Sequence, residues 1–491
     1  MWSERFLVKK RMRAGLAIIS IGTLVCLLSK PAAIVAQAPA GTPAKGPTPV
    51  LSPTDPDPAA MRRAIEDLVC SFGQRYPKGP QFLERLAALE EQWAKVLDKP
   101  AAQQEPVRRQ LAALRREALL ANPLLDFDKL LVIRRGVKSP DLGLPRNSMS
   151  NSALRRTGYD DAICILSLGK PDAGLQIVYR PQATRIVADL ELHFDAQKLL
   201  FSMPDERDRW QVWEMGIDGQ HVRALTGQQP DVDCYDACYL PDGRIVFAST
   251  ACYNGVPCQG GRVDVANLYV MDADGRNIRQ LTFDQDDDWH PAVLNSGRIL
   301  YLRWEYADTP HYTTRLLFHM NPDGTEQMEY YGSNSYWPNA VFFARPIPGH
   351  PTKVVGIVSG HHGVHRMGEL VIFDPQKGRF EANGVVQRIP GFGRKVEPII
   401  ADNLVDASWP KFLHPYPLSE KYFLVAMQPS AESLWGIYLV DVFDNLVLIG
   451  EMPGYALLEP IPLRKTPRPP VIPPKANLDC KEAMVYVSDI Y

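Results

Sequence analysis

A unit of four short apolar strands recurs along the chain, and this repetition constrains the fold more than any other feature. One copy begins at Cys238 and continues with expected strands at 244–249, 267–272 and 278–282. Turns of Asp-Gly type, which favour positive φ, separate the strands tightly. Further copies begin at Leu192, His290, Trp337 and Trp409. Four antiparallel strands over this length are typical of one blade of a β-propeller.

A sixth blade can be assembled from the two ends of the repeat region. Residues 127–135, 162–168 and 175–180 supply three strands, and residues 455–463 supply the innermost one. Pairing of 455–463 with 127–135 closes the ring and leaves no free sheet edge. The sequence therefore predicts a mainly β chain with a six-bladed β-propeller over residues 122–463.

A small α-helical N-terminal region precedes the propeller, at residues 59–121. Phe82, Leu86, Leu89 and Trp93 recur at helical spacing, and a second helix ends near Asn122. Such an extension is either a partner-binding hairpin or, more commonly, a packing or spacer element. The 43 prolines among 491 residues favour turns over long helices elsewhere.

The first 38 residues have the pattern of an export signal. A positive stretch with Lys9, Lys10, Arg11 and Arg13 precedes a short apolar run at 14–28, and Ala36-Gln37-Ala38 offers a cleavage site. Residues 39–58 read as a Pro- and Ala-rich disordered linker. We expect an exported, periplasmic protein. Because Pro39 disfavours cleavage, an uncleaved N-terminal anchor is the alternative, and only that form would contact a membrane.

The long loops of the predicted propeller gather on one face. Successive strands of a blade run in opposite directions. The loops between the second and third strands therefore lie on the same face as the crossings between blades, and the tight Gly turns lie on the other face. Loops that elaborate one face indicate a binding surface. Neither a Gly-x-Ser-x-Gly elbow nor a zincin motif occurs, so catalytic residues stay unknown. The predicted contact residues are Trp304, Glu305, Asp308, His311, Tyr312, His361, His362 and His365.

Cysteines and acidic residues near this face allow metal or disulfide chemistry. For an exported chain, disulfides are the common use of the clustered Cys234, Cys238, Cys252 and Cys258. A thiolate-bound Zn²⁺ at Cys252 and Cys258 is the alternative. Clustered carboxylates suit Ca²⁺, although capping of turns is their commoner use. The histidines at 361, 362 and 365 have metal-ligand spacing, with solvated or packing histidines as the commoner case. The candidate metal residues are Cys252, Cys258, Asp231, Asp233 and His290.

Two resemblances follow from particular segments. Residues 268–277 and 279–282 closely resemble the TolB-like propeller repeat. Most of 117–491 resembles the α subunit of hydrazine synthase and its exported multihaem relatives. That family implies a propeller followed by a domain with covalent c-type haem, and a propeller cysteine near the haem with a metal, which Cys252 or Cys258 could match. The segments that carry it are 122–129, 207–214, 234–261, 308–317, 330–339 and 359–374.

The chain contains no Cys-x-x-Cys-His haem attachment motif. The resemblance therefore implies the haem-free scaffold or contact part of a redox protein, whose haem c comes from a missing or partner domain. Residues 464–491 are expected to be a Pro-rich linker and the start of that domain. The expected partner is a c-type haem domain, a cytochrome or another periplasmic protein; the net charge of −2 argues against nucleic acid. The alternatives are a stand-alone TolB-like binding propeller and a metal-dependent enzyme on the long-loop face.

Overall fold

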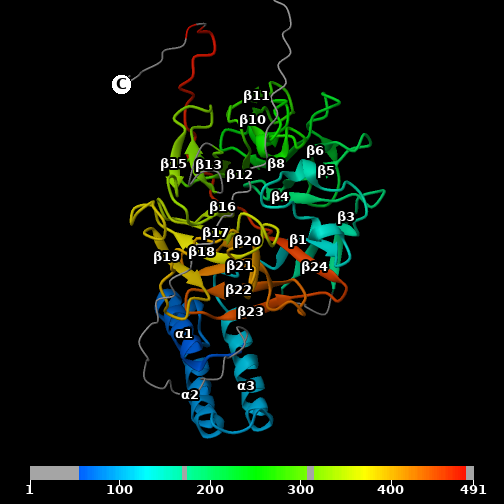
Figure 1. The fold of residues 1–491 in the computed structure, drawn as a ribbon. Coiled ribbons are helices and arrows are strands. Elements are labelled where there is room, and N and C mark those ends of the chain that lie inside the picture. The colour runs from blue at the N-terminus through cyan, green and yellow to red at the C-terminus, as the bar shows by residue number, and fades with distance from the viewer. Residues whose placement is uncertain (1–54, 169–173, 307–313, 481, 483–491) are drawn as a thin grey trace, which may run out of the picture. The chain divides into compact units, whose positions relative to one another are not determined.

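The computed structural model describes residues 55–168, 174–306, 314–480 and 482. It is mainly β, with a propeller-like arrangement of sheets and three helices near the N-terminus (Figure 1). The predicted signal at 1–38 and residues 39–54 of the predicted linker lie outside the described residues, and the last linker residue, Pro58, begins α1. In the described part of the chain, no helix combines the length and the apolar character needed to cross a membrane.

The helices confirm the expected helical region: α1 (Pro58–Phe72), α2 (Gly79–Val96) and α3 (Ala101–Leu120). At the start of α1, Asp57 accepts a hydrogen bond from the N–H of Ala59, which satisfies an otherwise unpaired donor. Ile65, Leu86 and Leu111 are buried in one cluster together with sheet residues such as Leu458. The shared core supports the packing role over a free partner-binding hairpin.

The strands form four four-stranded sheets and one eight-stranded sheet. The sheet that joins the two chain ends has the order β24 (Tyr455–Pro462), β1 (Lys129–Gly136), β2 (Asp161–Ser167) and β3 (Leu175–Tyr179). The next is β4 (Ala188–Leu192), β5 (Lys198–Pro204), β6 (Trp210–Gly216) and β7 (Arg223–Ala224). It is followed by β8 (Cys234–Tyr239), β9 (Ile245–Ser249), β10 (Asn267–Met271) and β11 (Arg279–Gln280).

The eight-stranded sheet contains two antiparallel groups of four strands. The first is β12 (Asp288–Val293), β13 (Ile299–Trp304), β14 (Arg315–Met320) and β15 (Met328–Tyr331). The second is β16 (Ala340–Pro346), β17 (Val354–Ser359), β18 (Glu369–Phe373) and β19 (Val385–Ile389). A single parallel residue pair, Arg315 with Ala340, joins the groups. The remaining sheet is β20 (Lys411–Pro417), β21 (Tyr422–Gln428), β22 (Gly436–Asp441) and β23 (Leu446–Gly450).

The predicted closure between the chain ends is confirmed. β1 pairs antiparallel with β24, in a register that includes Ile133 with Leu458 and Arg135 with Ala456. Both strands are almost fully buried. The same sheet continues outward through β2 and β3, and β24 is its innermost strand.

Two faces follow from the strand connections. The tight-turn face comprises the turns 193–197, 217–222, 240–244, 272–278, 294–298, 321–327, 347–353, 374–384, 418–421 and 442–445. The long-loop face comprises 137–160, 180–187, 205–209, 225–233, 250–266, 281–287, 305–306, 332–339, 360–368, 390–410 and 429–435.

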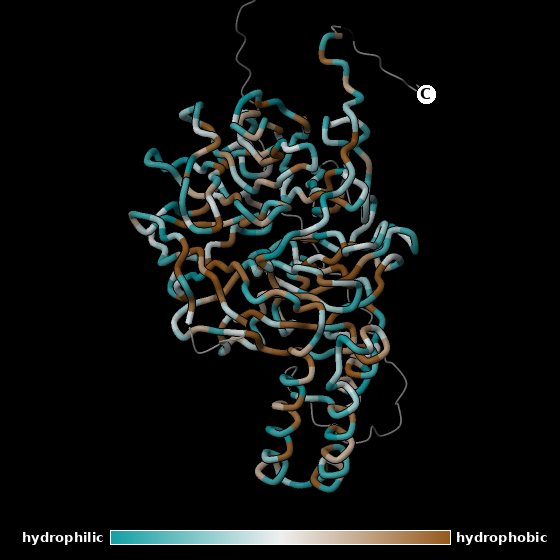
Figure 2. The backbone as a smooth tube through the Cα atoms, turned by 180° about the vertical axis from the view of Figure 1, so that it is seen from behind, coloured by the Kyte–Doolittle hydropathy of each residue, from teal (hydrophilic) through white to brown (hydrophobic). Residues whose placement is uncertain are grey.

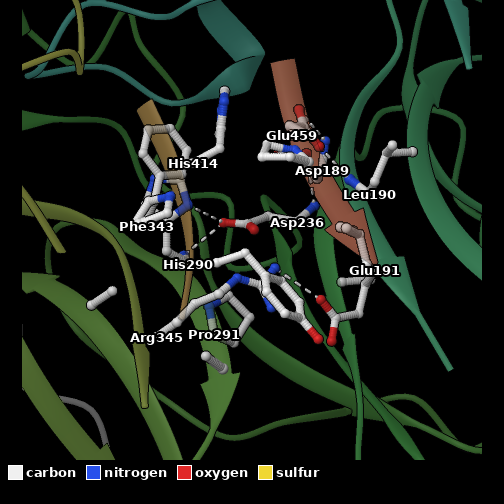
Figure 3. A pocket seen from close by; sticks show the side chains of 17 residues that line it. Asp189, Leu190, Glu191, Asp236, His290, Pro291, Phe343, Arg345, His414 and Glu459 are labelled. Carbon is white, nitrogen blue, oxygen red and sulfur yellow. Dashed lines mark hydrogen bonds and ion pairs between the residues drawn. The ribbon is translucent and has the colours of Figure 1, made fainter. Parts of the chain in front are cut away.

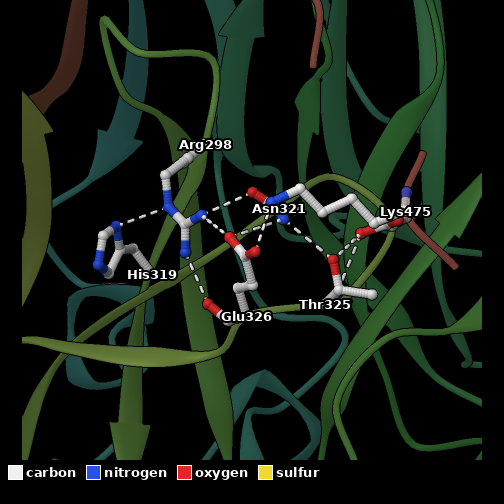
Figure 4. A network of polar contacts seen from close by, with 7 residues as sticks. Arg298, His319, Asn321, Thr325, Glu326 and Lys475 are labelled. Atoms are coloured by element: carbon white, nitrogen blue, oxygen red, sulfur yellow. Dashed lines mark hydrogen bonds and ion pairs between the residues drawn. The ribbon is translucent and has the colours of Figure 1, made fainter. Parts of the chain in front are cut away.

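Residues 464–476 lie along the tight-turn face, whereas the sequence suggested a free linker. The N–H of Thr466 donates to the carbonyl of Phe194 at 3.0 Å. Farther along, the guanidinium of Arg468 donates to the carbonyl of Pro241 at 3.2 Å, and the N–H of Ala476 donates to Asp323 at 2.9 Å. Prolines remove backbone donors but leave carbonyls and charged side chains to bind. This segment forms a strap over one turn from each of three successive four-strand groups, which begin at β4, β8 and β12. Figure 2 shows the backbone from behind, coloured by hydropathy. Figure 4 shows Lys475 of the strap within a network of polar contacts that includes Arg298 and Glu326.

Candidate functional site

The predicted contact residue Trp304 is not on the surface. Its side chain is 1% exposed and packs against Val256 and Val265. The guanidinium carbon of Arg315 lies 4.2 Å from the centre of its ring, a cation–π contact. The prediction of Trp304 as a contact residue is therefore wrong, because neighbouring loops and a buried arginine cover the ring of this last residue of β13.

The structure describes only some of the other predicted contact residues. Glu305 is partly exposed and contacts Arg303 at 3.3 Å. Asp308, His311 and Tyr312 lie outside the described residues. Their role in the contact surface remains a prediction.

The three histidines of the 361–365 loop do not converge. His361 and His362 lie within 4.8 Å of Asp402, counted between metal-binding atoms, but Nδ1 of His365 lies 3.3 Å from the carbonyl of Leu144 instead. Both Asp402 oxygens contact Nδ1 of His362 at 3.0 Å. The guanidinium of Arg315 lies 2.7 Å from Nδ1 of His361. A fixed positive charge so close opposes a metal cation, so this group is better suited to hold its loop against residues 390–410.

Several exposed aromatic residues on the long-loop face were not among the predicted contact residues. Tyr253 is 68% exposed and Phe283 is 77% exposed, and Tyr306, Tyr336 and Trp409 follow at 38–41%. They come from loops and crossings beside β9, β11, β13, β15 and β20. Aromatic side chains are enriched at protein interfaces. The sequence signal was available, since each of these residues flanks a strand end on this face.

The described cysteines are free thiols, which corrects the disulfide prediction for Cys234, Cys238 and Cys252. A bulge in β8 between Tyr235 and Cys238 places Cys234 and Cys238 in different core clusters. Their sulfurs therefore cannot approach each other. Cys252 contacts the carbonyl of Val265 at 3.3 Å through Sγ. The side chain of Cys258 is outside the described residues, so its disulfide or metal use remains a prediction.

Thiol reactivity tests this assignment. Burial raises the pKa of Cys234 to about 12 and that of Cys164 to about 11, whereas Cys70 and Cys480 are exposed. Because the thiolate is the reactive form, iodoacetamide should label Cys70 and Cys480 first in the native protein and Cys164 and Cys234 only after unfolding. Peptide mass mapping reads this out. If Cys234 does not react after unfolding without reductant, it forms a disulfide and its assignment as a free thiol is wrong.

The predicted metal residues Asp231, Asp233 and His290 occupy three different settings. Asp233 is 1% exposed, accepts from the N–H of Trp210 at 2.9 Å and pairs with Arg156 at 3.0 Å. This is the capping use of an aspartate. Asp231 is exposed, and His290 lies in the central channel. The structure does not bring these residues together with Cys252.

The central channel contains a buried polar site. Strands β4, β8, β12, β16, β20 and β24 line a cavity of about 70 Å³ (Figure 3). Each of these strands has a register shift and, at the shift, one non-glycine residue with positive φ. Such backbone strain concentrates at functional sites. The six residues are Asp189, Asp236, His290, Phe343, His414 and Glu459.

Hydrogen bonds and ring contacts connect these six residues in series around the channel, from Glu459 to His414. The carboxylate of Glu459 accepts from the N–H groups of Asp189 and Leu190 at 3.2 and 2.6 Å. Asp189 in turn accepts from the N–H of Asp236 at 3.1 Å. Asp236 then accepts from the N–H of His290 at 2.6 Å.

The other half of the series is aromatic. The rings of His290 and Phe343, and those of Phe343 and His414, have centroids 4.4 Å apart. The six inner strands are thus linked in the order β24, β4, β8, β12, β16 and β20, by carboxylate acceptors on one side and by tilted ring contacts on the other.

Burial dominates the electrostatics of the channel. Burial and the neighbouring carboxylates of Asp236 and Glu459 raise the pKa of Asp189 well above its usual range. Burial also raises the pKa of Glu459. Burial would raise the pKa of Asp236 too, but the contacts with His290 outweigh it and lower that pKa. The pKa of His414 is well below its usual range because of burial and then the charge of Arg135, so its imidazole is neutral.

The two ends of the channel differ. Residues 144–151 cover the long-loop end: Asn151 donates to Asp189 at 3.0 Å, and Asn147 donates to the carbonyl of Gly360 at 2.7 Å. At the other end the cavity shares Glu191, Arg345 and Tyr416 with a groove of about 470 Å³ that the strap residues 464–469 line. Access therefore runs from the tight-turn face.

The fold defines a mainly β protein of the propeller type. Neither a family model nor a curated protein matches the chain. Among solved structures, hydrazine synthase from Kuenenia stuttgartiensis matches with a TM-score of 0.53 and 16% identity, over 70% of this chain and 48% of that chain. The chain thus spans less than half of that relative, and the likeness concerns the fold.

Two TolB structures match more weakly. TolB from Acinetobacter baumannii has a TM-score of 0.38 and 11% identity, over 72% of each chain. The TolB-like protein from Agrobacterium tumefaciens has a TM-score of 0.35 and 17% identity, over 54% of this chain and 90% of that chain.

Proposed function

We propose that the chain is the haem-free propeller portion of an exported redox protein and that its long-loop face binds a c-type haem domain or cytochrome. The observation that carries this proposal is the set of exposed aromatic residues on that face, with Tyr253 68% and Phe283 77% exposed. Aromatic side chains are enriched in protein interfaces, so rings left exposed on one face favour a partner surface there. The fold likeness to hydrazine synthase supports the choice of partner.

The proposal includes a six-bladed ring over residues 122–463. The eight-stranded sheet then counts as two blades, because one residue pair alone joins its halves. Six inner strands around one channel support this count. The export signal at 1–38 and a further domain after the strap belong to the same proposal.

The interface can be tested by purifying the tagged full chain from cells that produce it natively and staining the bound material for covalent haem. We expect a haem protein to co-purify. Replacing Tyr253 and Tyr336 together by alanine should weaken its binding about tenfold or more, since central aromatic residues dominate interface energies. Surface plasmon resonance with the purified partner measures the change.

Phe380 provides a matched control. It is 49% exposed and lies in the 374–384 turn, on the tight-turn face. Phe380→Ala should leave the affinity unchanged. Equal losses from both faces would contradict the proposed surface. A haem-free partner that depends on the same tyrosines would replace the redox role with that of a stand-alone binding propeller.

A further inference from the structure

We propose that the central channel binds a small protonated amine, with its ammonium group among the carboxylates of Asp189, Asp236 and Glu459. The inference concerns a site separate from the long-loop face and does not rest on the proposed partner.

The size of the cavity limits the ligand to a few atoms. At about 70 Å³, it has room for roughly five water molecules. A ligand with about five non-hydrogen atoms is therefore the upper limit. The walls next to the six channel residues include Pro291, Pro415 and Ile461, which suit a short alkyl group.

The charge of the walls favours a cation. Four carboxylates line the cavity, from Asp189, Glu191, Asp236 and Glu459, together with one guanidinium, from Arg345. Arg366 adds a second guanidinium, 3.1 Å from Nε2 of His290. Four negative groups against two positive groups leave an excess of two negative charges when all the carboxylates are ionised. The two imidazoles do not offset it, because burial lowers the pKa of both.

An unsatisfied group points to a missing ligand. Nδ1 of His414 is buried and has no hydrogen-bond partner among the described residues. Buried polar atoms are nearly always paired, and an exception calls for a water, an ion or a ligand. His414 lines the same cavity as the carboxylates of Asp189, Asp236 and Glu459. Figure 3 shows His414 and Asp236 on two sides of the same space.

The spacing of the acceptors favours an ammonium group over a metal ion. A metal ion with three protein ligands needs donor atoms that converge, and no three such atoms from the channel lie within 4.8 Å of one another; in the described chain that spacing occurs at His361, His362 and Asp402. An ammonium group donates several hydrogen bonds in different directions, so it can bridge separated acceptors. The ring of Phe343 adds a surface for a cation–π contact.

Calorimetric titration of the full chain with ethylammonium chloride tests the proposal, with ethanol as the neutral isostere. We expect saturable binding of ethylammonium alone. Asp236→Asn should weaken it about tenfold or more. Asp205→Asn removes a carboxylate that lies outside the channel and pairs with Arg207, and it should leave the affinity unchanged. Binding of ethanol, or equal affinities in the two variants, would overturn the site.

The unaltered protein gives a second test in case Asp236→Asn fails to fold. Asp189 and Glu459 have raised pKa values, so ammonium binding should displace protons, seen as different heats in buffers of different ionisation enthalpy. Affinity should fall as the pH is lowered from 8 to 5, because these carboxylates become protonated while the amine stays charged. A pH-independent affinity without proton release, or preferential binding of Ca²⁺ or Mn²⁺ in competition with the amine, would overturn the proposal.

Discussion

Replacing Arg135 by alanine is expected to lower the free energy of unfolding by about 3–5 kcal/mol. Arg135 in β1 binds Asp161 in β2 with two parallel hydrogen bonds, Nε to Oδ1 at 3.1 Å and a terminal nitrogen to Oδ2 at 2.8 Å. The side chains are 2% and 0% exposed. The alanine variant leaves the carboxylate of Asp161 buried without its cation, and that uncompensated charge accounts for the loss.

The effect should spread beyond one sheet. The guanidinium also donates to the carbonyls of Leu142 and Val187, and the N–H of Val187 donates to Asp161 at 3.0 Å. The pair therefore fastens the closing sheet to the start of β4. Guanidinium chloride unfolding followed by tryptophan fluorescence measures the change.

An exposed pair provides the control for this prediction. Arg276 and Asp274 are 81% and 53% exposed and lie 3.5 Å apart. Solvent screens such a pair, so Arg276→Ala should leave the unfolding curve unchanged. Similar losses in both variants would show that removing any arginine perturbs the protein, and that the buried pair has no special role.

Strand positions could be predicted from the sequence because their signals are local. Alternating apolar residues and Asp-Gly turns identified the inner and middle strands. The strand at 455–463 belonged to none of the five complete units, and this predicted its pairing with 127–135 to close the ring. The inner-strand bulges could not be predicted in the same way, because non-glycine residues such as Asp189 and Phe343 take positive φ only under tertiary constraint. A partial signal exists: prolines 291, 415 and 460 directly follow three of the six bulge residues, and proline within a strand often marks a bulge.

The surface residues depended on long-range packing that no local pattern records. Trp304 was assigned to a loop, but Val256, Val265 and Arg315 come from other segments to cover it. The loop at 144–151 was not recognised as a cover for the channel, because its contacts with Asp189 and Gly360 join residues far apart in the sequence. The long-loop face itself was predicted from strand direction, which does not depend on side-chain packing. Exposed aromatic residues therefore do lie on the predicted face.

Removing β24 should have an even larger effect than the Arg135 variant. A chain that ends at Gly454 lacks Leu457, Leu458 and Ile461, which are at most 5% exposed. Loss of a single buried leucine side chain costs about 2–5 kcal/mol, and a domain is stable by only about 5–15 kcal/mol. We therefore expect this chain to lose its cooperative thermal transition. Differential scanning calorimetry measures this directly.

A chain that ends at Leu463 separates the strand from the strap. It keeps β24 and its pairing with β1 but loses the contacts of the strap with Phe194, Pro241 and Asp323. Those contacts are partly exposed hydrogen bonds, each worth about 1 kcal/mol, so this chain should still unfold cooperatively at a moderately lower temperature. If the two shortened chains melt alike, β24 is not the element that closes the ring. If only the chain that ends at Gly454 loses its cooperative transition, β24 is the element that holds Glu459 and the other channel residues in place.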